Sequence, residues 1–322
     1  MNQEILLQNQ VLIYLFSQSL LLLLSVIAFF GTLLILKDWD FHATSTKQYR
    51  LEKISYLVIL IITISLYIKI ILVPYFAYSI DELSNIVPGA MCAAGIINAN
   101  EYGSPLLFLK FFILWMIGVW LIINHEDIKA KNYPYIKKKF YFFLFIFSLI
   151  VLEFSTEILY FSNISTQKPV SCCSVIFGLS GNNGIPFGLS ISLLVTLFYL
   201  IFILNIILAL QKSRTLLAIS SLFFLYIAYY ALINFFGTYI YQLPTHICPF
   251  CMLQKEYFFV GYFLWGSLFL GIFFSISNFT LKLIIDKEID SFYRYSIIFN
   301  TIFILLSTIY PITYYIFNGV WL

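Results

Sequence analysis

Two cysteines separated by two residues, Cys248 and Cys251, precede Gln254 and Lys255 at the beginning of a long apolar run. Thiols at this spacing can form a disulfide, and the positive end of a helix dipole at a helix start favours the thiolate of the first one. His246, two residues upstream, could add positive charge or transfer a proton. We therefore expect a redox pair with Cys248 as its nucleophile. The same spacing also supplies half of a structural zinc site.

Transmembrane helices are the elements expected to position these thiols, because 61% of the 322 residues are hydrophobic and only 10% are charged. A helix needs about 20 mainly apolar residues to cross the hydrocarbon core. The chain offers eight such runs, at roughly 11–36, 54–80, 105–124, 140–163, 187–210, 216–242, 253–277 and 295–317. The sequence therefore predicts an all-α polytopic membrane protein, with a single integral domain over residues 1–322 embedded in a lipid bilayer.

Basic residues are distributed unevenly among the segments between these helices. Fourteen of the eighteen Lys and Arg residues lie in 37–53, 125–139, 211–215 and 278–295. The positive-inside rule places those segments in the cytoplasm, and we expect a bacterial inner membrane with both termini outside. Because the basic residues form no continuous face, we expect no nucleic-acid binding.

All five cysteines lie in the three segments expected to face outward, which makes three outward hairpin loops that carry cysteine. The other three cysteines are Cys92, Cys172 and Cys173. Outside the cytoplasm thiols can be oxidised and remain so, and an odd number leaves one thiol over or pairs it with a partner. A bond between the adjacent Cys172 and Cys173 would close a strained ring, so a bond from either to Cys92 or to the Cys248–Cys251 pair is the easier geometry.

The stretch Cys248-Pro-Phe-Cys251-Met-Leu-Gln254-Lys255 resembles the Cys-x-x-Cys-x-x-Glu/Gln-Arg stretch of the DsbB-type thiol oxidases, and vitamin K epoxide reductase-like proteins place a CxxC similarly. The resemblance covers about ten residues. It implies that Cys248 and Cys251 pass electrons to a membrane quinone, with Lys255 and Gln254 at the quinone. It also implies a second cysteine pair that exchanges with a soluble thioredoxin-fold partner.

The chain departs from that family in three ways. Lysine stands at the arginine position, the remaining cysteines precede the CxxC, and eight helices are expected where the family has four.

Four ionisable residues lie inside the predicted spans, where a charge is costly unless it is paired or neutralised. They are Lys69, Lys110, Glu153 and Glu157. Glu153 and Glu157 are four residues apart and so share one helix face. Either the four form buried ion pairs that hold helices together, or they serve a proton path beneath the outer face.

Two functions from different classes fit these observations. The first is a membrane thiol-disulfide oxidoreductase, in which electrons pass from an outer dithiol through Cys172 or Cys173, and Cys92, to Cys248–Cys251 and a quinone. The alternative is a soft-metal (Cu or Zn) binding or transport protein, in which the five cysteines bind the ion with Met91, Met252 and His246. The spans contain no ladder of cysteine or histidine along which an ion would cross. A third possibility is a structural subunit braced by disulfides in its outer loops.

Overall fold

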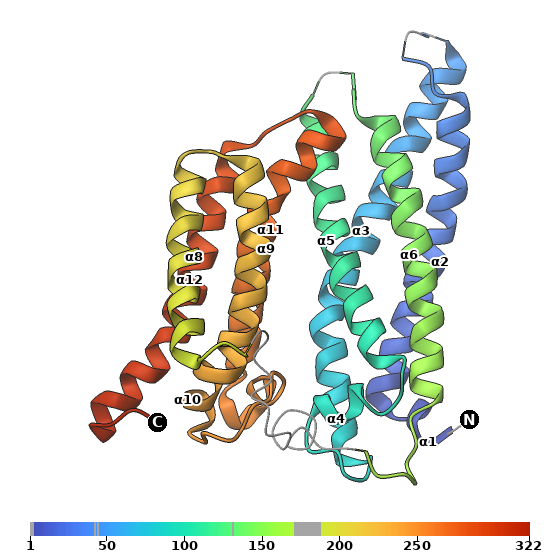
Figure 1. Ribbon diagram of the computed structural model, residues 1–322. Coiled ribbons are helices and arrows are strands. Elements are labelled where there is room, and N and C mark those ends of the chain that lie inside the picture. The colour runs from blue at the N-terminus through green and yellow to red at the C-terminus, as the bar shows by residue number, and fades with distance from the viewer. Residues whose placement is uncertain (1–2, 42, 44, 131, 171–187) are drawn as a thin grey trace. The chain divides into compact units, whose positions relative to one another are not determined.

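The computed structural model describes the chain except for residues 1–2, 42, 44, 131 and 171–187 (Figure 1). Its described residues form helices and no strand. Eight helices are long and apolar enough to cross a membrane. The expected all-α polytopic membrane fold is therefore confirmed.

The long helices lie close to the predicted runs. They are α2 (Asn9–Asp38), α3 (Thr46–Glu82), α5 (Gly103–Lys129), α6 (Ile136–Ser162), α8 (Ile191–Leu210), α9 (Arg214–Ala231), α11 (Val260–Ile285) and α12 (Asp290–Asn318). The span of α9 continues through a π-helical turn, η3 (Leu232–Phe236), into α10 (Gly237–Tyr241). Shorter elements are α1 (Gln3–Leu6), α4 (Ala93–Ile97) and the 3-10 turns η1 (Leu83–Asn85), η4 (Cys251–Leu253) and η5 (Lys255–Tyr257).

The chain divides into two compact units, which we call unit 1 and unit 2. Unit 1 comprises Met1–Pro88 and Ile96–Pro169, and unit 2 comprises Gly89–Gly95 and Val170–Leu322. Each contains four of the eight long helices. The short segment Gly89–Gly95 carries Cys92 into unit 2, although most of its sequence neighbours belong to unit 1. The expectation of one domain over 1–322 stays a prediction.

In unit 1, α2 packs against α3 and α6, and α5 packs against α6. Gly31 lets α2 and α3 approach closely, since a Cβ there would lie 2.5 Å from Val58 Cγ2. The apolar core between these helices includes Ile113, Trp120 and Phe140.

In unit 2, α8 packs against α9, and α11 packs against both α9 and α12. Four aromatic rings meet at the centre of this bundle, those of Phe198, Phe224, Phe236 and Phe303. Gly271 brings α11 against α12, because a Cβ there would lie 2.2 Å from the Asn300 side-chain oxygen.

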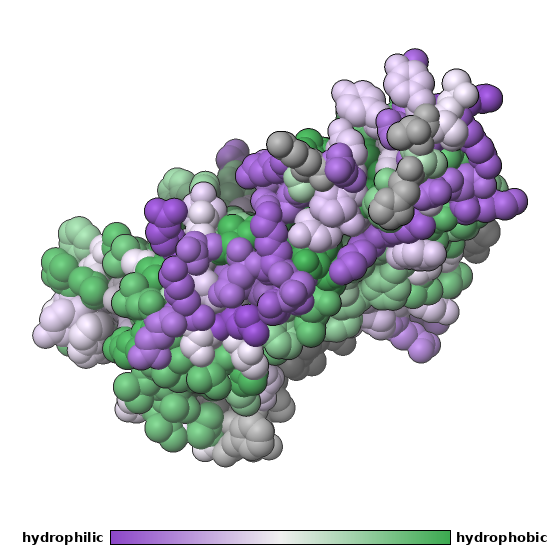
Figure 2. Space-filling model, turned by 90° about the horizontal axis from the view of Figure 1, so that it is seen from above, coloured by the Kyte–Doolittle hydropathy of each residue, from purple (hydrophilic) through white to green (hydrophobic). Residues whose placement is uncertain are grey.

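The basic connections within each unit meet at one end of its helices. In unit 2, Lys212 pairs with Asp290 at 3.0 Å and Arg214 with Glu288 at 3.6 Å, which joins the α8–α9 and α11–α12 connections. In unit 1, the Lys137 ammonium lies 5.4 Å from the centre of the Phe41 ring. Figure 2 shows hydrophilic side chains gathered over such helix ends and hydrophobic ones along the helix flanks.

The predicted helix 253–277 begins later and ends later than expected. Phe258 and Phe259 both adopt left-handed backbone conformations, with φ of 53° and 56°, and α11 begins only at Val260. Bulky side chains rarely adopt this conformation, and it interrupts the helix. The expectation that Cys248 and Cys251 stand at the start of the long helix is therefore wrong, because two short 3-10 turns lie between them and α11.

Candidate functional site

Three cysteines from distant parts of the sequence meet in unit 2. Cys92 lies just before α4, Cys248 lies in the loop after α10, and Cys251 begins η4. The Sγ atoms of Cys92 and Cys248 are 3.7 Å apart. All three Sγ atoms lie within 4.8 Å of one another, and each cysteine is buried. We call this group the three-cysteine cluster.

Tyr241 of α10 makes two hydrogen bonds to the loop that contains the CxxC pair. Its hydroxyl donates to the backbone oxygen of Cys248 and accepts from the backbone N–H of Met252 at 3.1 Å. Gln242, with φ 53°, ends α10 and turns the chain into this loop. On the other side, Trp265 of α11 donates its indole N–H to the Pro249 oxygen at 3.1 Å. The irregular backbone between the two cysteines is thus fixed by two side chains from regular helices.

Close packing fixes the position of η4 against the beginning of α11. A Cβ at Gly261 would lie 2.6 Å from Met252 Cγ and 2.9 Å from the Met252 backbone carbon. Only glycine therefore admits η4 at this distance. Met252 is fully buried, whereas Met91 is 72% exposed, so the two methionines suggested as metal ligands have different surroundings.

Gln254 joins the two cysteine-bearing segments. Its side-chain amide donates to the backbone oxygen of Met91 at 3.4 Å, next to Cys92. The residue therefore spans the distance between η4 and the segment of Cys92. Lys255, the other residue that the resemblance assigns to a quinone, is exposed. A role of either residue at a quinone stays a prediction.

His246 lies beside the cluster, with its ring centre 4.4 Å from that of Tyr241. Partial burial lowers the pKa of the imidazole, which favours the neutral ring. The three-cysteine cluster is the group of possible metal ligands found among the described residues, and His246 is not part of it. The remaining two cysteines, Cys172 and Cys173, lie outside the described residues, and the roles assigned to them stay predictions.

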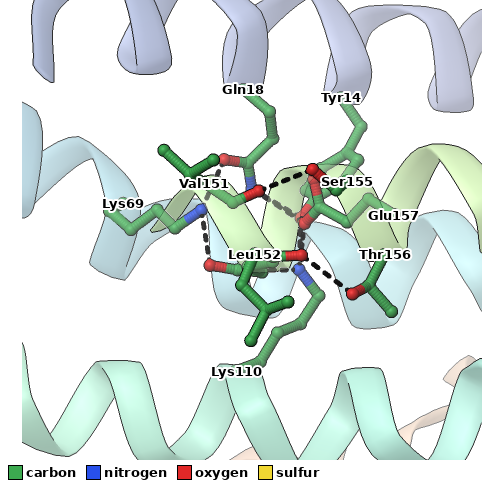
Figure 3. A network of polar contacts seen from close by, with 10 residues as sticks. Tyr14, Gln18, Lys69, Lys110, Val151, Leu152, Ser155, Thr156 and Glu157 are labelled. Atoms are coloured by element: carbon green, nitrogen blue, oxygen red, sulfur yellow. Dashed lines mark hydrogen bonds and ion pairs between the residues drawn. The ribbon is translucent and has the colours of Figure 1, made fainter. Parts of the chain in front are cut away.

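The four charged residues expected inside the membrane form one connected group in unit 1. Figure 3 labels Lys69, Lys110 and Glu157 of this group. One carboxylate oxygen of Glu153 forms an ion pair with the Lys69 ammonium at 2.9 Å. The other oxygen forms an ion pair with the Lys110 ammonium at 2.8 Å. Lys110 also contacts Glu157 Oε1. The four residues therefore form buried ion pairs that are joined in a single network, and a role in a proton path stays a prediction.

Two further residues close this network into a ring, and sequence reasoning missed both. Tyr14 donates its hydroxyl to Glu157 Oε1 at 2.5 Å and accepts from Gln18 at 2.5 Å. Gln18 in turn accepts from Lys69 at 2.6 Å. The available signal was the spacing of Tyr14 and Gln18, which are four residues apart in the first apolar run and share one helix face. We call these six residues the polar ring; none of them is more than 4% exposed.

A second buried pair lies at the opposite end of unit 1 and was also missed. Lys139 and Asp127 are fully buried and 2.5 Å apart. Lys139 donates to Asn124 at 3.1 Å, and Asp127 accepts from the Tyr135 backbone N–H at 2.7 Å. These bonds join the end of α5 to the beginning of α6, which is a structural role.

Comparison with known proteins assigns no family. No protein-family model matches the chain, and neither a curated protein nor a solved structure is significantly similar to it. The chemistry of the two sites must therefore be argued from their geometry.

Proposed function

We propose that the protein is a membrane thiol-disulfide oxidoreductase in which Cys248 and Cys251 form the redox pair and Cys92 exchanges with them. The observation that carries this proposal is the 3.7 Å contact between Cys92 and Cys248, which are 156 residues apart in sequence. A sulfur at this distance from one member of a CxxC pair is placed for thiol-disulfide exchange, which proceeds by attack of a thiolate on a disulfide sulfur.

Thiol-disulfide exchange within the three-cysteine cluster forms one sulfur–sulfur bond and breaks another. The Cys92 thiolate attacks Cys248 of a Cys248–Cys251 disulfide, the bond between those two sulfurs breaks, and Cys251 leaves as a thiolate. The product is a Cys92–Cys248 mixed disulfide. When Cys251 attacks Cys248, the reverse step restores the pair and releases Cys92. Electrons from an outer dithiol reach the pair by the same kind of step.

A quinone is the proposed electron acceptor. Closing a disulfide from two thiols releases two electrons and two protons, which together convert a quinone to a quinol. Unit 2 contains four long helices among its described residues, the number that the resemblance to DsbB-type oxidases implies for a complete unit. Next to the cluster, Lys255 and the 89% exposed Phe258 offer a cation and an aromatic surface at a helix end.

The proposed location is a bacterial inner membrane with the cysteine loops on the extracytoplasmic side. The basic connections of unit 2 lie at the end of its bundle opposite the three-cysteine cluster, as the positive-inside rule requires of this orientation. An extracytoplasmic protein of thioredoxin fold would supply the electrons through Cys172 or Cys173.

Soft-metal binding is the second candidate, and the compactness of the cluster favours it. Three thiolates around Zn²⁺ or Cu⁺, at metal–sulfur distances of about 2.3 Å in a tetrahedral site, lie roughly 3.8 Å apart. The separation of Cys92 and Cys248 is close to this value. The two candidates differ in the state of the thiols, since metal binding keeps them reduced.

The experiment uses the full chain in two preparations. Acid quenching of the cells preserves the thiol state for mass spectrometry, and native protein purified in detergent is used for activity. In Cys251→Ser, the leaving thiol is lost, so we expect a Cys92–Cys248 disulfide to accumulate, identified by mass spectrometry of the joined peptides. With wild-type protein, added dithiol should reduce a soluble quinone, and Cys92→Ala should slow this reaction by about tenfold or more. Met91→Ala, which changes the exposed neighbour of Cys92, is the matched control.

The metal reading gives a different pattern. Wild-type thiols would all be reduced, with about one Cu or Zn per chain, and Cys92→Ala and Cys251→Ser would lose the metal equally. That pattern, without quinone reduction, would overturn the oxidoreductase proposal in favour of the metal site.

A further inference from the structure

Within the polar ring of unit 1, the two carboxylates differ in how many of their oxygens have partners. Both oxygens of Glu153 are engaged in ion pairs with lysines. Glu157 accepts only on Oε1, which receives Tyr14, Lys110 and Gln18, the last at 3.4 Å. Its Oε2 is buried and has no hydrogen-bond partner in the described part of the chain. The ring therefore contains one carboxylate oxygen aimed at no donor.

Glu157 is fully buried, and its charge is balanced only through Oε1, which contacts Lys110 and Tyr14. A buried polar atom without a hydrogen bond is costly, and Oε2 is such an atom. Well-packed apolar side chains would stabilise the helices as well as a buried ion-pair network does, or better. Ionisable groups inside a membrane protein are candidates for a functional role, and the oxygen without a partner singles out Glu157.

We propose that unit 1 contains a proton-exchange site at Glu157. A proton adds to Oε2 and converts the carboxylate to a neutral carboxyl group, and its release restores the carboxylate. No other covalent bond forms or breaks. With both glutamates ionised, the two lysines balance them; with Glu157 neutral, the ring carries one positive charge, shared by lysines that still contact Glu153.

The groups around Glu157 come from every long helix of unit 1. Tyr14 lies on α2, Lys69 on α3, Lys110 on α5 and Glu153 on α6 itself. The Tyr75 ring stacks on Tyr14 with centroids 6.4 Å apart. The short helix α1 also packs against α6 and contributes the buried Ile5. Among these described groups, Glu157 is the acid with an unused oxygen.

Water at one end of unit 1 is the proton source and sink. Glu157 lies five residues before the end of α6, and Tyr14 five residues after the beginning of α2. At about 1.5 Å per residue, both are roughly 8 Å from that end. A proton therefore has about one and a half helical turns to cross between that end and Glu157. This proposal does not rest on the proposed thiol chemistry of unit 2.

Infrared difference spectroscopy on the full chain in lipid vesicles tests it. Difference spectra recorded across a range of pH should contain the C=O band of a buried protonated carboxyl group. Glu157→Gln should remove that band. Glu101→Gln, which replaces an exposed carboxylate of unit 1, is the control and should leave it.

Tyr14→Phe keeps the proposal testable if a glutamate variant fails to fold. It removes the hydroxyl that donates to Oε1, so the band should move to higher frequency while its intensity is retained. A structural network would contain no protonated carboxyl at any pH in the range. A wild-type spectrum without the band, or a band that Tyr14→Phe does not shift and Glu157→Gln does not remove, would overturn the proposal.

Discussion

Unit 1 and unit 2 each contain four long helices, but they differ in which polar and reactive side chains they bury. Every buried charged side chain among the described residues belongs to unit 1, and all three described cysteines belong to unit 2. The buried polar groups of unit 2 are serines, asparagines and a threonine. One unit therefore keeps charge between regular helices, while the other keeps an apolar interior and places thiols in loops.

The difference follows from the reach of the side chains. Lysine and glutamate are long enough to meet from separate helices, so the polar ring needs no irregular backbone. A cysteine sulfur lies close to the main chain, and three of them can meet only if the backbone segments themselves come together. Unit 2 achieves this with the π-helical turn η3, the 3-10 turns η4 and η5, and the left-handed Phe258 and Phe259. π-Helical turns occur frequently near functional sites.

The largest expected effect concerns the orientation of the two units, which should be the same. With native thiols replaced, single cysteines at Asp40 in unit 1 and Ser213 in unit 2 should be protected from a membrane-impermeant maleimide in intact cells, since both are in basic connections. Cysteines at Asn163 and Thr245 should be labelled completely. Labelling of Ser213 but not Asp40 would mean that the units insert in opposite directions, and the thiols of unit 2 would then face a reducing compartment.

The next effect concerns the buried charges that distinguish unit 1. Lys110→Met removes an ammonium that contacts both glutamates and Tyr14, leaving buried carboxylates short of a partner. We expect a loss of about 3–5 kcal/mol in the free energy of unfolding, measured by circular dichroism during denaturation in mixed micelles. The double variant Lys110→Met/Glu157→Gln should recover part of it.

Unit 2 supplies the comparison for this experiment. Ser275→Ala breaks a buried hydrogen bond of 2.5 Å to Ser296 and should cost only about 1 kcal/mol, because both groups are neutral. Equal losses for Lys110→Met and Ser275→Ala would mean that the charges of unit 1 do not set it apart energetically.

A smaller effect is expected where η4 packs on α11 in unit 2. Gly261→Ala forces Met252 away and should cost about 1–3 kcal/mol, and it should reduce trapping of the Cys92–Cys248 disulfide in a Cys251→Ser background. Gly266→Ala in the same helix meets no atom within 4 Å and should be neutral or slightly stabilising. If both variants trap the disulfide equally, close packing at Gly261 does not position the cluster.

The sequence predicted the helices well because apolar runs longer than about 20 residues have few alternatives. It also selected the charged residues, since a lysine or glutamate inside such a run is conspicuous. Tyr14 and Gln18 were missed because burying a neutral tyrosine or glutamine in a membrane helix costs less free energy than burying a charge. Neither residue is therefore unusual in an apolar run. Their place in the ring depends on how α2 faces α3 and α6, which one sequence does not reveal.

The predicted start of helix α11 was wrong. The segment between Cys251 and Val260 contains neither proline nor glycine. Nothing in the local sequence predicts two consecutive phenylalanines in the left-handed conformation. The loop before these residues is held by long-range contacts, with Tyr241 and Trp265 bonded to its backbone and Gly261 packed against Met252. The contact of Cys92 with Cys248 likewise spans too much sequence for spacing rules to specify it.

The smallest expected effect is a pH dependence at the edge of the three-cysteine cluster. Burial lowers the pKa of His246 in the folded protein, so the unfolded chain binds more protons just below the ordinary pKa of about 6.5. Stability should therefore rise with pH through that window and be lost on acidification. Because the ring is only half-buried, we expect a change in Tm of about 1 °C between roughly pH 5.5 and 7.5, absent in His246→Gln. His125→Gln, which replaces an exposed histidine of unit 1, should leave the dependence unchanged. If His246→Gln retains it in full, the protons responsible bind elsewhere, and His246 contributes nothing to the difference between the two units.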